Sequence, residues 1–162
     1  SKQIMQLNPF RGYCFSLKME IIIDTREQRD YSEEFDKLNI KYRREKLPTG
    51  DYLLWPKSCV VERKNLDDWI CSITRDRDRF VKEIERGLLF DFFAIIIEAD
   101  YYDIINGNYY ANVPPNVILS TMLKWQVKYR IPIILTGTRQ GGALAISKLF
   151  EGYLQYEDKN VR

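Results

Sequence analysis

GDYLLWPKSCVVERKNLDDW, from Gly50 to Trp69, is the stretch that decides the fold. Two short apolar runs flank the turn residues Pro56–Ser58, which predicts a β-hairpin. Asn65 is a favourable helix N-cap, and Asp67 and Asp68 follow in the first turn, where negative charge is favoured. The stretch therefore predicts two strands and a helix, with charges of both signs where the second strand ends.

Apolar runs and helical patterns alternate along the rest of the chain. MEIIID (19–24), FFAIIIEAD (92–100) and IPIILTG (131–137) are short enough to be buried strands, and KYRREKLP (41–48) is a further strand candidate. Helices are expected in 25–39, after Asn65, around Phe80 to Leu88, in 116–130 and in 141–154, and a loop in 101–114. This order predicts an α/β domain with a mixed central β-sheet flanked by helices.

Composition excludes several kinds of site. The chain has 162 residues and no histidine, which removes Ser-His-Asp triads and histidine zinc sites. Its three cysteines suit free thiols in a reducing compartment, so an intracellular location, cytoplasm or nucleus, is expected. No stretch is long enough to span a membrane, and the net charge of +2 does not by itself indicate nucleic acid.

Carboxylates and a lysine meet in the predicted hairpin. Side chains alternate in a strand, so Glu62 and Lys64 share one side and Arg63 takes the other, while Asp51 begins the partner strand. Two carboxylates could hold magnesium or manganese, and Lys64 could position the attacking water. An ordinary solvated ion pair at a strand end remains the alternative.

A family resemblance rests on these residues. IIIDTREQ (21–28), GDYLLW (50–55) and VVERKNLDD (60–68) resemble the nuclease domain of the XPF family of structure-specific endonucleases. The family signature is a Gly-Asp, then Glu-Arg-Lys, then an Asp four residues after the Lys. It is matched by Gly50, Asp51, Glu62, Arg63, Lys64 and Asp68, with Asp24 as the upstream acid. Glu83 stands where the family usually has Gln, which puts a DNA contact at that position in doubt.

The resemblance implies a restriction-endonuclease-like fold and metal-dependent cleavage of DNA at flaps, forks or junctions, in repair or recombination. It implies catalytic roles for Asp24, Asp51, Glu62 and Lys64, with the three acids binding magnesium or manganese. The supporting residues expected around them are Arg26, Glu27, Arg63 and Asp68. The nuclease domain is expected over 19–155, with an N-terminal extension or leader over 1–18 and a C-terminal tail over 156–162.

Basic residues near the motif could contact DNA phosphates. The candidates are Arg43, Arg44, Arg75, Arg79, Lys82 and Arg86, the last four forming one stripe if their segment is a continuous helix. Acidic residues interleave with this stripe, as on an ordinary surface helix.

Assembly and activity leave alternatives open. The last helix is apolar over more than one face, which predicts a homodimer, or pairing with a related subunit, with Phe150 or Tyr153 at the interface. A non-catalytic scaffold that binds DNA or a partner is the second hypothesis, and a junction resolvase of the same fold is the third. Either an excised nuclease domain or a small stand-alone relative fits the length.

Overall fold

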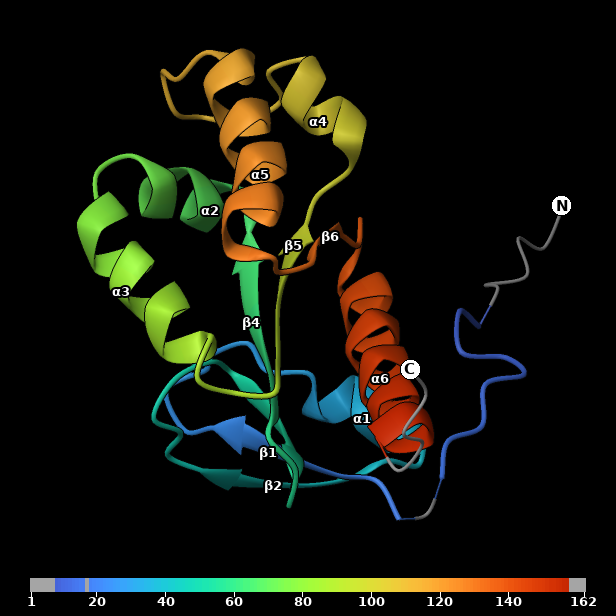
Figure 1. The fold of residues 1–162 in the computed structure, drawn as a ribbon. Coiled ribbons are helices and arrows are strands. Elements are labelled where there is room, and N and C mark those ends of the chain that lie inside the picture. Colours follow the sequence, from blue (N-terminus) through green and yellow to red (C-terminus); the bar gives the residue numbers. More distant parts are fainter. Residues whose placement is uncertain (1–7, 17, 158–162) are drawn as a thin grey trace, which may run out of the picture.

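The computed structural model describes residues 8–16 and 18–157 of the chain (Figure 1). One six-stranded sheet has the order β2-β1-β3-β4-β5-β6. Its strands are β1 (Glu20–Asp24), β2 (Lys41–Glu45), β3 (Tyr52–Trp55), β4 (Cys59–Asn65), β5 (Phe92–Glu98) and β6 (Ile133–Leu135). The helices are α1 (Ser32–Lys37), α2 (Leu66–Ile73), α3 (Arg77–Gly87), α4 (Tyr101–Ile105), α5 (Pro115–Tyr129) and α6 (Arg139–Glu157).

The hairpin at the centre of the sheet joins its two halves. β3 pairs antiparallel with β4, with Tyr52 opposite Val61, and antiparallel with β1. The pairs β1–β2, β4–β5 and β5–β6 are parallel. The predicted hairpin and the predicted mixed sheet are therefore confirmed.

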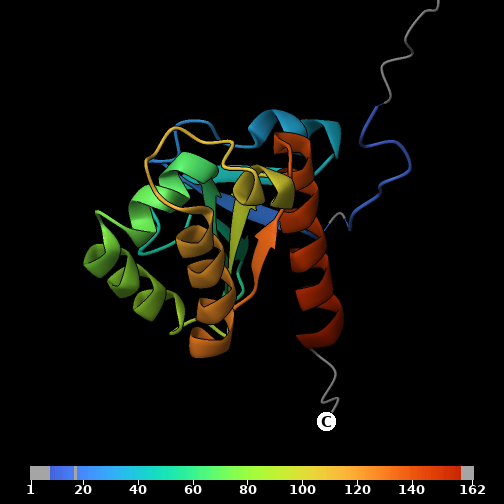
Figure 2. The same cartoon turned by 90° about the horizontal axis from the view of Figure 1, so that it is seen from above.

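Each face of the sheet is covered by its own helices (Figure 2). β5 shows the alternation directly, because Ala94 and Ile96 belong to one apolar cluster and Ile95 and Ile97 to the other. The first cluster is completed by α1 and α6, and the second by α2, α3 and α5. The central strands are thus buried on both faces, which explains why β1, β4 and β5 contain continuous apolar runs, whereas the edge strand β2 is polar.

Three local predictions change. Residues 101–105 form α4 within the predicted loop, because Asp100 and Asp103 make a reciprocal capping box at its start. β6 is an edge strand whose Ile134 and Leu135 pack against opposite clusters but are only half-buried, so it is less deeply covered than expected. α3 begins at Arg77, so Arg75 lies outside it and the predicted stripe is not continuous.

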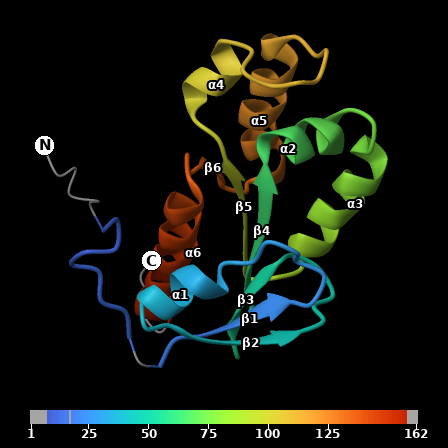
Figure 3. The ribbon, with the colours of Figure 1, turned by 180° about the vertical axis from the view of Figure 1, so that it is seen from behind.

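The chain ends bear on the expected domain bounds. Phe10 and Phe15 are buried in the α1/α6 cluster, in a segment on the outer side of α6 (Figure 3), so part of the 1–18 extension belongs to the core. α6 continues to Glu157, past the expected boundary at 155. Residues 1–7, 17 and 158–162 of the expected extension and tail lie outside the described residues. No helix in the described ranges is both long and apolar enough to cross a membrane.

Candidate active site

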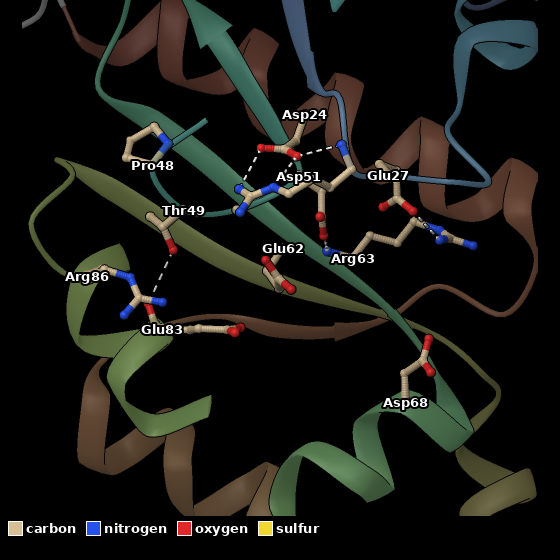
Figure 4. A pocket seen from close by; sticks show the side chains of 12 residues that line it. Asp24, Glu27, Pro48, Thr49, Asp51, Glu62, Arg63, Asp68, Glu83 and Arg86 are labelled. Carbon is tan, nitrogen blue, oxygen red and sulfur yellow. Dashed lines mark hydrogen bonds and ion pairs between the residues drawn. The ribbon is translucent and has the colours of Figure 1, made fainter. Parts of the chain in front are cut away.

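A cavity of about 220 Å³ opens where β1, the turn before β3, β4, α2 and α3 meet (Figure 4). Most of its lining is charged. Its acidic and arginine side chains are Asp24, Arg26, Glu27, Asp51, Glu62, Arg63, Asp68, Glu83 and Arg86. The predicted catalytic acids therefore share one cavity with every predicted supporting residue.

Backbone pairing brings the acids together. The amide of Asp24 donates to the carbonyl of Asp51 at 2.8 Å, and the amide of Asp51 donates to the carbonyl of Val61 at 3.0 Å. Gly50 makes the turn possible, since its φ is +77° and a Cβ would lie 2.4 Å from Val60 Cγ2. The glycine of the sequence motif is thus required by both conformation and space.

Negative charge on Asp51 and Glu62 is unfavourable in this cavity. The amide of Arg63 donates to Asp51 Oδ2 at 2.7 Å, and Lys64 Nζ lies 3.5 Å from Glu62 Oε1. Burial, with the charges of Glu62 and Glu27, raises the pKa of Asp51 well above its ordinary range. Burial also raises the pKa of Glu62, to about 7, although Lys64 opposes the shift. A divalent cation would relieve this repulsion, so these two oxygen donors fit magnesium or manganese.

Asp24 is engaged differently. Arg26 holds its carboxylate through Nε to Oδ1 and Nη2 to Oδ2, each at 2.9 Å, and the amides of Arg26 and Leu47 donate at 2.8 Å. Burial would raise the pKa of Asp24, but these hydrogen bonds outweigh it and lower the pKa. Within residues 8–16 and 18–157, no group of three or more acidic, cysteine or histidine side chains is arranged to hold a metal ion. The predicted three-carboxylate metal site stays a prediction.

Lys64 and Arg63 lie on opposite sides of β4. Lys64 sits over the Phe80 ring, with Nζ 4.5 Å from its centroid, beside Glu62 but outside the cavity lining. Arg63 pairs with Glu98 at 2.7 Å and with Glu27 at 3.2 Å, and covers the Tyr31 ring. The Tyr31 hydroxyl donates to Glu98. Arg63 is therefore the centre of a buried ionic network.

Only one of the proposed DNA-contact residues reaches the cavity. Arg86 lines it from α3, whereas Arg75 and Arg79 pair with Asp76. On β2, the sheet edge, Arg43 pairs with Glu20 and Arg44 with Asp30. Lys82 is exposed on α3 and does not line the cavity.

Glu83 is a site residue that sequence reasoning did not place. Its side chain lines the cavity from α3, and its charge contributes to the raised pKa of Glu62. The Thr49 hydroxyl lies 3.5 Å from the Glu83 carbonyl, which ties α3 to the turn before β3. The available signal was its position four residues after Arg79, on the helix that follows the motif.

The raised pKa of Glu62 predicts a pH effect on stability. Between the ordinary value of 4.5 and about 7, folded protein keeps a proton that unfolded chain releases, so stability falls as pH rises through this window. In EDTA, Glu62→Gln is expected to raise the free energy of unfolding at pH 8 by on the order of 1 kcal/mol, and by less at pH 5. Urea unfolding measures both values. Glu85→Gln, an exposed change on α3, is the control, and an equal gain at both pH values would contradict the prediction.

Comparisons with known proteins converge on one family. The model of the ERCC4 domain family matches residues 23–149. The chain is similar to XPF from Aeropyrum pernix, with 25% identity and a TM-score of 0.67, covering 85% of this chain and 66% of that chain. The structure of Aeropyrum pernix XPF in complex with DNA shows the same fold, at 24% identity and a TM-score of 0.66, covering 89% and 69%. No curated protein matches significantly.

Proposed function

The chain belongs to the ERCC4 domain family, with the restriction-endonuclease-like fold of the XPF nucleases, and from this we propose that it is a metal-dependent endonuclease acting on branched DNA. The observation that carries the proposal is the pair Asp51 and Glu62. Both face one cavity, both have a raised pKa, and Lys64 lies beside Glu62. Flaps, forks or junctions in repair or recombination would be the substrates.

Each residue of the site would have its own role in hydrolysis. Asp51 and Glu62 would hold a magnesium or manganese ion, which supplies a Lewis acid and a more acidic water at the phosphate. Lys64 holds a positive charge next to Glu62, where it could orient an attacking water and stabilise negative charge that develops on the phosphate. Arg86 faces the same cavity from α3 and is suited to a phosphate of the strand.

A substrate panel tests the proposal. The protein is incubated with end-labelled flap, fork, four-way junction and linear duplex DNA, with magnesium and separately with EDTA. We expect cleavage near the branch in magnesium, little cleavage of the linear duplex, and none in EDTA. Equal cleavage in EDTA, or of linear and branched DNA, would contradict it.

Lys64 has its own expected phenotype. Lys64→Ala should lower the single-turnover cleavage rate by about 10²-fold, because a positioned charge at the reacting group contributes that much. Manganese affinity, measured by calorimetry, should stay near that of the wild type. A variant that loses manganese affinity instead would show that Lys64 maintains the metal site.

A non-catalytic scaffold is the second candidate. It is favoured by the engagement of Asp24 with Arg26, which leaves no three-carboxylate group among the described residues. The substrate panel separates the two, since a scaffold would leave branched DNA uncut in magnesium.

We also propose a homodimer, or pairing with a related subunit, through α6. Phe150 cannot serve as predicted, because it is fully buried in the core of the monomer. Beside it, Leu149, Tyr153 and Tyr156 line an apolar groove of about 430 Å³ together with Phe92, at the start of β5. Burying these exposed apolar groups against a partner would be favourable.

Light scattering during size exclusion tests the assembly. At micromolar concentration we expect twice the mass of the 19.3 kDa chain, and Tyr153→Glu should shift the protein towards the single-chain mass. Tyr110→Glu, a change at a fully open position elsewhere, is the matched control. A wild-type mass of 19.3 kDa would contradict the proposal.

A further inference from the structure

Asp24 and Arg26 form a closed pair at the rim of the cavity. Each oxygen of Asp24 accepts two hydrogen bonds, one from the guanidinium of Arg26 and one from the backbone amide of Arg26 or Leu47. The Asp24 side chain is 2% exposed. A metal ligand needs a lone pair directed at the ion, so Asp24 would have to give up at least one of these donors to bind a cation.

Arg26 is held by the same contacts but stays open to solvent. Its side chain is 62% exposed although two of its guanidinium nitrogens are engaged. Nη2 also donates to the carbonyl of Leu47 at 2.8 Å, which fixes the plane of the group. Nη1 has no hydrogen-bond acceptor in the part of the chain that the structure describes. The guanidinium is thus oriented from one side and available on the other.

An oriented guanidinium with free N–H groups is suited to a phosphate. Arginine binds phosphate oxygens through its planar fork, and holding the fork in place beforehand lowers the entropy lost on binding. Arg26 lines the cavity that Arg86 lines from α3. In Figure 4, Asp24 lies above Glu62 and Arg86 lies to its left. A DNA strand that enters the cavity would therefore meet two arginine side chains from different elements of the fold.

We propose that Asp24 is a positioning residue for Arg26, whose guanidinium binds a backbone phosphate of the DNA, and that Asp24 is not a ligand of the metal ion. The inference rests on the proposed function, because it assigns roles within the same cavity. It leaves Asp51 and Glu62 as the metal-binding carboxylates.

A double-mutant cycle on DNA affinity tests the positioning role without metal. Anisotropy in EDTA measures binding of a labelled flap by the wild type, Asp24→Asn, Arg26→Ala and the double variant. Arg26→Ala should weaken binding about tenfold, as expected for a hydrogen bond to a charged group. Asp24→Asn should weaken it less, and the double variant should bind no more weakly than Arg26→Ala. Lys124→Ala, an exposed charge on α5, should change affinity by less than about twofold.

Outcomes that overturn the role of Arg26 are equally clear. Losses that multiply in the double variant would show that the two residues act independently. Wild-type affinity of Arg26→Ala for the flap would show that Arg26 does not contact a phosphate. This variant can be measured even if Asp24→Asn does not fold. Arg26→Lys, which keeps the charge without the fork, should restore only part of the affinity.

Manganese titration by calorimetry tests the second half of the proposal. Asp24→Asn should keep the wild-type affinity within about threefold, whereas Asp51→Asn should lose about tenfold or more. Equal losses in the two variants would overturn it and make Asp24 a ligand. A wild type that binds no manganese would contradict the proposed metal dependence, while the cycle in EDTA would still decide the role of Arg26.

Discussion

Asp51→Asn is expected to lower the single-turnover rate of branched-DNA cleavage by about 10³-fold, while the protein stays folded. The change removes one of the two carboxylates that can hold the metal ion. It keeps a side-chain oxygen that can accept the hydrogen bond from the Arg63 amide. It also removes a charge whose burial is unfavourable, so the free energy of unfolding should not fall.

The matched control for this variant is Asp67→Asn. Asp67 is an exposed acid in the first turn of α2 and does not line the cavity. Its loss should leave the cleavage rate within about threefold of the wild type. Rapid-quench measurements with saturating enzyme give both rates, and circular dichroism checks the fold. Asp51→Asn cutting at the wild-type rate would show that the cavity is not the catalytic centre.

Arg63→Ala is expected to lower the free energy of unfolding by about 3–5 kcal/mol. The Arg63 side chain is 9% exposed, and its partners Glu27 and Glu98 are 10% and 11% exposed. Removing the guanidinium leaves both carboxylates buried without their cation. Glu98 keeps the hydrogen bond that the Tyr31 hydroxyl donates. The cost of those uncompensated charges sets the size of the effect.

Urea unfolding of two comparison variants shows whether burial is the reason. Arg44→Ala breaks the pair with Asp30, where the arginine is 50% exposed, and should cost about 1 kcal/mol or less. Arg63→Lys keeps a charge and should lose less than Arg63→Ala. If Arg63→Ala and Arg44→Ala lose the same free energy, the network around Arg63 does not stabilise the fold as we infer.

The sequence predicted those parts of the fold that local chemistry determines. Turn residues between two apolar runs specify the hairpin, and Asn65 caps α2 through its side-chain oxygen, which accepts from the Asp68 amide at 2.8 Å. The helix at 101–105 was missed because its five residues are too few to show a helical period, and its start depends on the capping box of Asp100 and Asp103.

The site was predictable along β4 but not across the cavity. Alternation along one strand separates Glu62 from Arg63, and pairing in the hairpin brings Asp51 close. Which residues of α3 face the acids depends on how that helix docks, so Glu83 was considered only as a doubtful DNA contact and Arg86 was not distinguished from its neighbours. The hydrogen bonds between Arg26 and Asp24 depend on the rotamers of the two side chains. The alternation of residues along a strand does not predict these rotamers.

Anomalous scattering from crystals soaked in manganese tests the central claim most directly. We predict one peak in the cavity, with the ion about 2.1 Å from an oxygen of Asp51 and from an oxygen of Glu62. Asp24 should still accept hydrogen bonds from Arg26 in the same crystals. A cavity without manganese, in crystals of protein that cuts branched DNA with that ion, would contradict the account.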